Sequence, residues 1–370
     1  MSFADTYRGK RVLITGHTGF KGAWLSEWLI KLGANVTGLS LPPPTDPALF
    51  HQLNLATRLH DITGDIRDLA TVKRVVAECQ PDFIFHLAAQ SLVRLSYHQP
   101  IETYATNVMG TANVLEAVRS TERPCTVVAV TTDKCYENKE WLHGYREEDA
   151  MGGHDPYSSS KGAAELVISA YRRSFFNTPE SRVLLASARA GNVIGGGDWA
   201  LDRIVPDCIR ALQSNAPIPV RNLVATRPWQ HVLEPLSGYL WLGATLHHSR
   251  NKTASPLGPL ASAFNFGPAL ASNRPVAELV KEILKSWPGR WEDRSDPTAL
   301  HEAKLLNLAT DKAFHLLNWK PVWNFGETVA QTITWYRQNF NDPKSATART
   351  LQQIANYTTA AHSQNIAWAS

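Results

Sequence analysis

Three glycines at regular spacing follow the first apolar segment of the chain and begin its first predicted helix. After RVLIT, which ends at Thr15, the chain reads GHTGFKG, with glycine at Gly16, Gly19 and Gly22. Because they lack a Cβ atom, these residues permit a tight turn, close approach of the backbone to a pyrophosphate and dense packing of a helix on a sheet. The N-terminus of that helix supplies N–H groups and a positive dipole. The motif predicts a strand, a turn and a helix that bind a dinucleotide, with an ordinary glycine turn as the alternative.

Short apolar segments alternate with helical patterns over the first two thirds of the chain. Strands are predicted at 11–16, 35–40, 81–88, 126–132 and 183–190, and helices at 22–32, 68–79, 101–120 and 156–176. Continuous apolar strands between helices indicate a parallel sheet that is covered on both faces. The predicted fold class is therefore α/β, a doubly wound parallel sheet of the Rossmann type with a smaller C-terminal substrate lobe.

The pattern changes after about Gly191 to loops rich in glycine and proline, with isolated amphipathic segments such as 276–287. We expect residues 1–190 to form the dinucleotide-binding domain, with later segments contributing to it. Residues 191–370 are expected to form mainly the substrate lobe, interleaved with the last strands of the sheet.

Charge and composition exclude several classes of partner. Lys and Arg number 37 against 33 Asp and Glu, and the net charge of +4 is spread without long blocks, so we expect no nucleic acid and no membrane as partners. No apolar run approaches the roughly 18 residues of a membrane helix or begins a signal peptide, which leads us to expect a cytoplasmic protein. The four cysteines show neither CxxC pairs nor spacing with histidine, so we expect reduced thiols and no metal site.

The spacing GxxGxxG resembles that of the short-chain dehydrogenase/reductase superfamily. The resemblance implies NAD as the cofactor. It also implies that, besides the three glycines, the cofactor is held by His17, Thr18, Phe20, Lys21, Leu87, Ala88, Ala89, Gln90 and Asn107.

The end of the second predicted strand lacks the acidic residue that often binds the ribose of NAD. Ser40, Leu41 and Pro42 stand there, without an adjacent Arg for the 2′-phosphate of NADP, so we expect NAD to be held loosely. By the resemblance, Asp65 and Ile66 in GDIRD meet the adenine edge. The alternative is a carboxylate at a helix N-terminus, a role that suits Asp68 better than Asp65.

Tyr157 and Lys161 in YSSSK are four residues apart, so both lie on one face of the predicted helix. A lysine ammonium near a phenol favours the phenolate, which would lower the tyrosine pKa from about 10 and make a base. In the superfamily that this chain resembles, such a tyrosine exchanges a proton with a sugar hydroxyl and the lysine orients the nicotinamide ribose. A solvated helix face is the alternative.

A third group of polar residues, TTDKCYEN, lies at the carboxyl end of the predicted strand 126–132, where doubly wound sheets bind ligands. Thr132, Asp133 and Lys134 supply a hydrogen-bond donor, a carboxyl and an amine. This arrangement resembles the nucleotide-sugar 4,6-dehydratases. The resemblance implies that Lys134 removes the C5 proton of a 4-keto sugar while Asp133 protonates the leaving O6. The alternative is that both residues only cap the loop.

The Asp-Lys pair differs from the Asp-Glu of dTDP-glucose 4,6-dehydratases and resembles the cytidine-diphosphate-glucose 4,6-dehydratases. HLAAQSLVRLS, AGNVIGGGDW, RPWQHVLEP and LATDKAFHLLNWKP extend this resemblance over most of the chain. It implies CDP-D-glucose as substrate and a homodimer formed through the helices at 101–120 and 156–176. The substrate-binding residues that we expect are Asn192, Asp198, Trp199, Arg203, Arg227, which would bind the pyrophosphate, and His231.

The sequence leaves open the roles of two tryptophans, the roles of the arginines and the choice between rival activities. Trp199 and Trp229 are either core aromatics or stacking partners of the substrate, and each arginine is either a ligand or a surface charge. The rival activities are a nucleotide-sugar 4-epimerase, which Asp133 and Lys134 disfavour, and a dehydratase acting on another nucleotide-sugar. A non-enzymatic NAD-sensing protein would be expected to have lost Tyr157 or Lys161.

Overall fold

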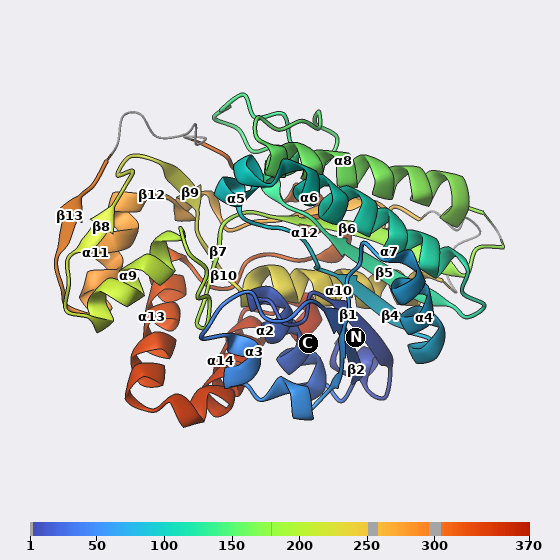
Figure 1. Ribbon diagram of the computed structural model, residues 1–370, viewed down its shortest axis with the longest axis horizontal. Coiled ribbons are helices and arrows are strands. Elements are labelled where there is room, and N and C mark those ends of the chain that lie inside the picture. Colours follow the sequence, from blue (N-terminus) through green and yellow to red (C-terminus); the bar gives the residue numbers. More distant parts are fainter. Residues whose placement is uncertain (1–2, 179, 251–257, 296–304) are drawn as a thin grey trace.

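A seven-stranded parallel sheet lies at the centre of the computed structural model, which describes residues 3–178, 180–250, 258–295 and 305–370 (Figure 1). Its strand order is β11-β6-β5-β4-β1-β2-β3. The strands are β1 (Arg11–Thr15), β2 (Asn35–Ser40), β3 (His60–Thr63), β4 (Phe83–His86), β5 (Cys125–Val130), β6 (Val183–Ala190) and β11 (Ala263–Phe266). The order changes direction between β1 and β4, and the carboxyl ends of these strands are where such sheets bind ligands.

The five predicted strands are confirmed, whereas β3 and β11 were not predicted. β3 is the tetrapeptide HDIT, whose residues are mostly exposed and polar, so it lacks an apolar signature. β11 is a buried AFNF segment, but it lies in the loop-rich part of the sequence. β3 is held by its pairing with β2, and β11 is held by its pairing with β6.

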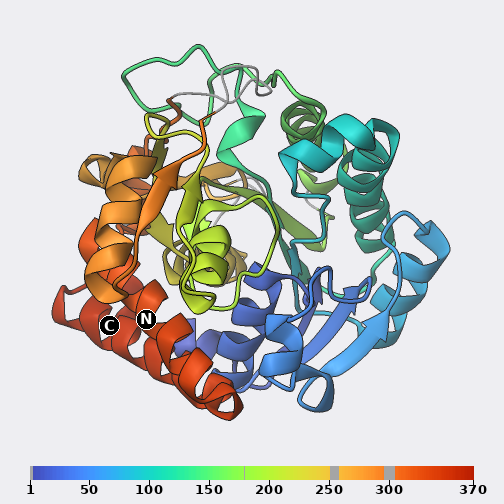
Figure 2. The ribbon, with the colours of Figure 1, turned by 60° about the vertical axis from the view of Figure 1, so that its left-hand side comes forward.

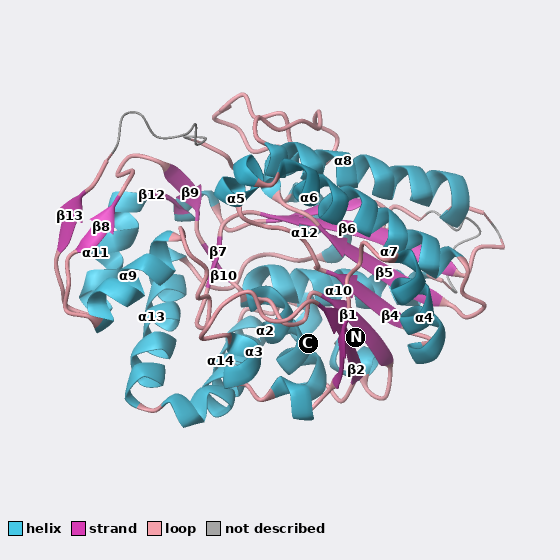
Figure 3. Cartoon of the chain, in the orientation of Figure 1, coloured by secondary structure: helices cyan, strands magenta, loops and turns pink. Residues whose placement is uncertain are grey.

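Helices cover both faces of the sheet (Figure 3). Leu13 belongs to an apolar cluster with α4 (Leu69–Cys79), α7 (Gly110–Arg119) and α8 (Pro156–Tyr171). Its neighbours Val12 and Ile14 belong to a second cluster with α2 (Phe20–Lys31), α10 (Leu233–Ser249) and α14 (Ala346–Ser363). Successive side chains of a strand point to opposite faces, so β1 is buried from both sides, as its continuous apolar sequence predicts.

The smaller lobe is built from three two-stranded ribbons and several helices (Figure 2). The ribbons pair β7 (Val193–Ile194) with β10 (Gln230–His231), β9 (Thr226–Pro228) with β12 (Asn273–Pro275), and β8 (Ile218–Val220) with β13 (Trp291–Asp293). The helices are α9 (Ile204–Gln213), α11 (Val276–Ser286), α12 (Asp311–Leu317) and α13 (Phe325–Asn341). Because β11 and α10 return to the large sheet, the chain passes between the two parts more than once, and the boundary at residue 190 stays a prediction.

The helix predicted at 101–120 is divided into three segments. α6 (Pro100–Tyr104) is followed by a π-helical turn (Ala105–Met109) and then by α7. Shorter helices elsewhere are α1 (Phe3–Tyr7), α3 (Leu49–Gln52) and α5 (Val93–His98). A single π turn inside an α-helix frequently marks a functional site, and here it turns Asn107 inward.

Two further properties concern the described residues alone. None of their helices combines the length and apolar character needed to cross a membrane. The four cysteines, at positions 79, 125, 135 and 208, are free thiols, and within these residues no group of three His, Cys, Asp or Glu side chains is placed to hold a metal ion.

Candidate active site

The glycine loop packs tightly at two of its three glycines. Gly16 has a φ of +80°, and a Cβ atom there would lie 2.7 Å from the amide nitrogen of Ala88. A Cβ atom on Gly22 would lie 2.1 Å from the carbonyl oxygen of Gly16. A Cβ atom on Gly19 would instead meet only that oxygen, at 3.4 Å. The loop therefore leaves space beside Gly19 at the N-terminus of α2, where a pyrophosphate can approach.

The side chains of His17 and Thr18 fasten this loop to the neighbouring strands. The buried ring of His17 packs on Gly38 of β2, and its Nε2 lies 2.8 Å from Oδ1 of Asp61. Thr18 Oγ1 lies 2.8 Å from the hydroxyl of Ser40 and donates to a backbone carbonyl oxygen at the end of β2. The side chains of both residues are thus bonded to the protein, and their contacts with the cofactor stay predictions. Phe20 packs on the apolar cluster that contains α2.

Asp65 and Ile66 are also held by the protein itself. Arg67 donates to Asp65 Oδ2 from Nε at 2.8 Å and Nη2 at 2.6 Å, and this interaction lowers the pKa of the carboxyl. The Ile66 side chain is buried against Gly110 of α7, so only its backbone can reach a ligand. Asp68 caps α4, as the alternative reading of this segment predicted.

The end of β2 is hollowed, and this hollow contains an acidic residue that the sequence analysis missed. It is lined by Pro42, Pro43, Pro44, Thr45, Asp46 and His51. Asp46 was overlooked because it lies six residues beyond Ser40 instead of directly at the strand end. It does not stand directly at the strand end, where such a carboxylate usually binds a ribose hydroxyl, so the loose binding of NAD stays a prediction.

Asn107 braces the loop after β4 against α8. Its Oδ1 accepts from the amide of Gln90 at 2.9 Å, and its Nδ2 donates to Gln90 O at 3.0 Å and to Ser160 Oγ at 2.8 Å. The Asn107 side chain is 1% exposed and bonded to the protein at both ends, so it supports the position of this loop. A contact of Asn107 with the cofactor stays a prediction, as it does for Leu87, Ala88, Ala89 and Gln90, which are half-buried beside Gly16.

The structure brings the turn after β5 against the start of α8. Thr132 precedes the 3-10 turn Asp133–Cys135 and donates to Asp133 Oδ1 at 2.9 Å. Asp155 caps α8, which sets Tyr157 in its first turn, close enough to Thr132 for the threonine side chain to lower the tyrosine pKa. Two motifs 25 residues apart in the sequence thus meet at one point.

Asp133 is 1% exposed, and its Oδ2 has no hydrogen-bond partner among the residues that the structure describes. That oxygen faces Gly191, where a Cβ atom would lie 2.8 Å from it. The next residue, Lys134, is half-buried. Its side-chain amine takes no ion pair or hydrogen bond within the described part of the chain. Both groups are therefore free to act on a ligand.

Burial sets the pKa values of the other titratable groups here. Burial raises the pKa of Tyr157 to about 12, against the lowering effects of Thr132 and Arg203. The lowering expected from Lys161 is not among the causes of this shift, and the loss of phenolate hydration dominates the pKa of Tyr157 in the protein alone. Burial lowers the pKa of Lys161 to about 8, and burial together with Arg203 lowers the pKa of Lys21 to about 8. With pKa values of about 8, Lys161 and Lys21 are still mostly protonated at neutral pH, and Arg203 adds a third positive charge. These cations favour an anionic ligand.

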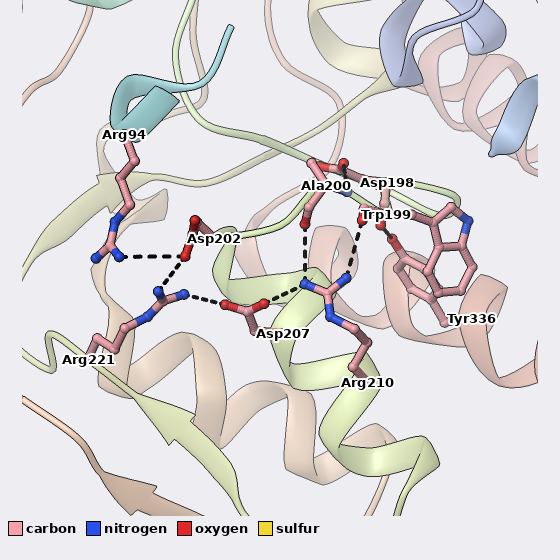
Figure 4. Close-up of polar contacts among 9 residues, drawn as sticks. All are labelled: Arg94, Asp198, Trp199, Ala200, Asp202, Asp207, Arg210, Arg221 and Tyr336. Atoms are coloured by element: carbon pink, nitrogen blue, oxygen red, sulfur yellow. Dashed lines mark hydrogen bonds and ion pairs between the residues drawn. The ribbon is translucent and has the colours of Figure 1, made fainter. Parts of the chain in front are cut away.

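Arg203 is carried by the loop between β7 and α9. Its Nη1 donates to Asp198 Oδ2 at 2.8 Å, and its charge acts on Tyr157, so the loop faces the proposed site. Figure 4 shows the contacts that hold this loop. Asp202 forms ion pairs with Arg94 of α5 and with Arg221. Arg210 donates to the backbone carbonyl oxygens of Trp199 and Ala200, and the hydroxyl of Tyr336 donates to Asp198 O. Arg203 and Asp198 are therefore placed as a fixed pair.

Two expected substrate residues, Trp199 and His231, are packed against the core, and their contacts with a nucleotide-sugar stay predictions. The Trp199 ring packs edge-on against Tyr336 and its Nε1 donates to Gln52. His231 is 0% exposed, with Trp24 and Trp323 packed against its ring. Apolar packing, which sequence spacing does not reveal, turns these side chains inward.

The remaining expected substrate residues lie on and beside the small ribbons. Trp229 is likewise a core residue, and its Nε1 donates to the carbonyl of Arg274. Arg227 is a buried residue of β9, and Asn192 is half-buried beside β10. Their contacts with a nucleotide-sugar stay predictions.

Comparisons with known proteins agree with these features. The family model for GDP-mannose 4,6 dehydratase matches residues 13–255. A CDP-glucose 4,6-dehydratase of Salmonella typhimurium is 47% identical over 338 residues, which cover 90% of this chain and 91% of that protein. A dTDP-D-glucose 4,6-dehydratase of Bos taurus is 26% identical over 91% of both chains.

Solved structures share the fold. An epimerase from Methanothermobacter thermautotrophicus superposes with a TM-score of 0.74 at 24% identity, covering 93% of this chain and 97% of that one. A dTDP-glucose 4,6-dehydratase from Streptomyces venezuelae, solved with NAD bound, gives a TM-score of 0.73 at 23% identity, covering 90% and 98%.

Proposed function

The chain belongs to the GDP-mannose 4,6-dehydratase family of nucleotide-sugar dehydratases, and on that premise we propose that it converts CDP-D-glucose to CDP-4-keto-6-deoxy-D-glucose with NAD. The observation that carries this proposal is the meeting of Thr132, Asp133 and Lys134 with Tyr157 at the carboxyl end of β5. The 47% identity to a CDP-glucose 4,6-dehydratase supports the choice of nucleotide.

The residues present fit a dinucleotide. The open space beside Gly19 and the N-terminus of α2 suit its pyrophosphate, and Asp46 or the backbone near Asp65 suits its adenosine. When bound, NAD supplies a site that accepts a hydride from C4 of the sugar and later returns it to C6. Lys161, one helical turn after Tyr157, lies on the face of α8 from which it would hold the nicotinamide ribose.

The chain's own groups account for the proton movements. Tyr157, held by Thr132, takes the proton from O4 as C4 is oxidised. Lys134 then removes the C5 proton, which has become acidic because it lies next to the new carbonyl group. The C6–O bond breaks, a C5=C6 double bond forms, and Asp133 gives its proton to the departing O6, which leaves as water. Lys134 would return a proton to C5 as C6 receives the hydride. The proton taken from O4 would restore Asp133 through solvent.

The proposal is tested by offering CDP-glucose, dTDP-glucose, UDP-glucose and GDP-mannose separately and following the 4-keto-6-deoxy product by NMR. We expect CDP-glucose to be turned over best. Far better turnover of dTDP-glucose would refute the choice of nucleotide, and a 4-epimer that keeps its C6 oxygen would show an epimerase. NAD binding without turnover of any sugar would favour the sensing protein.

We further propose a homodimer formed through the α6–α7 segment and α8. These neighbouring helices expose large apolar side chains, among them Ile101 (73% exposed), Met109 (57%) and Leu166 (62%). Such an apolar surface on adjacent helices is costly in water and suits a second copy of the chain. Light scattering should give a mass near twice 41.0 kDa, and a monomer at micromolar concentration would contradict the proposal.

A further inference from the structure

A buried ion pair lies next to the candidate site, and its hydrogen bonds join α8, β6 and the chain on either side of the turn 132–135. Glu165 of α8 and Arg189 of β6 approach to 2.9 Å between Oε2 and Nη2, and each side chain is 4% exposed. Glu165 follows Lys161 by one helical turn, so it lies on the same face of α8. Sequence analysis did not single out either residue, because 24 positions separate them.

The pair holds the chain on both sides of the turn that carries Asp133 and Lys134. On one side, the hydroxyl of Thr131 donates to Glu165 Oε1 at 2.5 Å. On the other side, Arg189 Nη1 donates to the hydroxyl of Tyr136 at 2.7 Å. The residues between these two points, 132–135, are the turn itself.

Further hydrogen bonds fix the pair in the sheet. Ser187 donates to Glu165 Oε2 at 2.9 Å, and Arg189 also donates to the carbonyl oxygen of Glu147 at 2.9 Å. Tyr136 in turn donates to Asn265 of β11 at 2.8 Å. Two buried charges gain little stability over well-packed apolar side chains, because each loses its hydration, but their directional bonds define one arrangement.

We propose that Glu165 and Arg189 are positioning residues that hold the turn 132–135 in register with Tyr157 and Lys161. This inference rests on the proposed dehydratase function. In this role the pair aligns two sets of groups. The group that acts at O4 lies on α8, and the groups that act at C5 and C6 lie on the turn. A shift of about 1 Å between two such sets can lower a rate about 100-fold without removing any reacting group.

The test removes one hydroxyl at a time and leaves both charges in place. Thr131→Val keeps the shape of the side chain but deletes its bond to Glu165, and Tyr136→Phe deletes the hydroxyl that meets Arg189. We expect each variant to lower kcat at least about tenfold while KM for CDP-glucose stays within about twofold. Reduced cofactor should build up during turnover, because C4 oxidation then outruns elimination. Thr131→Ser, which restores the hydroxyl, should recover most of the rate.

Thr126→Val is the matched control. Thr126 is a 0% exposed residue at the opposite end of β5, and its hydroxyl contacts His247 Nδ1 at 3.3 Å. It should keep the wild-type kcat, and thermal unfolding of all variants checks that they fold. Equal rates for the Val variants at 131 and 126 would overturn the inference while leaving the function intact, as would a loss that Thr131→Ser does not recover. A wild-type protein that makes no 4-keto-6-deoxy sugar would overturn both proposals.

Discussion

Glu234 carries a buried carboxyl group at the contact between α10 and the C-terminal part of the chain. It is 0% exposed and accepts hydrogen bonds from the amides of Val322 at 3.0 Å and Trp323 at 2.7 Å and from the hydroxyl of Tyr357 at 2.7 Å. Burial nevertheless raises its pKa from 4.5 to about 7. We predict that Glu234→Gln removes a pH dependence of stability that this group causes.

The sign follows from proton binding. Between about pH 4.5 and pH 7 the folded state keeps the Glu234 proton that the unfolded state has lost, so the free energy of unfolding falls as the pH rises through this window. At about 1.4 kcal/mol per pKa unit, the rise from 4.5 to about 7 corresponds to about 3 kcal/mol. His86 and His231 act in the opposite direction, because burial lowers the pKa of each to about 3.

The measurement is therefore the difference in the free energy of unfolding between the wild type and Glu234→Gln. Urea unfolding of the wild type and of Glu234→Gln across about pH 4 to 8 should give free energies whose difference changes by about 3 kcal/mol in favour of the variant as the pH rises. Tyr357→Phe keeps the carboxyl but deletes a bond that lowers its pKa, so it should extend the window to higher pH. Parallel pH profiles for the wild type and Glu234→Gln would refute the reasoning.

Three predictions concern the candidate site. Tyr157→Phe should bind CDP-glucose in calorimetry but lose about 10² to 10⁴ of its turnover, because only the proton acceptor is deleted; wild-type turnover would exclude Tyr157 from the chemistry. Lys134→Met should still oxidise C4 but stall before elimination, so that reduced cofactor and a 4-keto sugar with its C6 hydroxyl accumulate. Normal product carrying solvent deuterium at C5 would exclude Lys134 as the base. Pro42→Asp, at an exposed position of the hollow beyond β2, should tighten NAD binding by about one to two decades through a charged hydrogen bond to the ribose. Wild-type protein that retains stoichiometric NAD through dialysis would contradict the loose binding on which this last prediction rests.

The sequence was most informative where the signal is local. A strand followed by GHTGFKG gives the first unit of the sheet, and both Tyr157 and the turn at Asp133 lie where the order of strands and helices placed them. The position of β11 could not be predicted in this way, because its four residues are a strand only through pairing with β6.

Side-chain direction and burial were the other limits. His231 and Trp199 stand in motifs together with expected ligands, but tertiary packing turns both into the core. The raised pKa of Tyr157 likewise depends on how deeply α8 is covered, which spacing along the helix does not record. Glu165 and Arg189 meet only because α8 packs against β6 in the folded chain.

The late return of β11 has a consequence for synthesis. β6 is buried along its whole length, and its outer edge pairs with β11, which lies more than seventy residues further along the chain. At ribosomal speed, the backbone of an apolar strand therefore stays unpaired for on the order of ten seconds in each nascent chain. Such an edge is a template for pairing with other chains, so premature termination before Ala263 should yield aggregates instead of a shortened but folded enzyme.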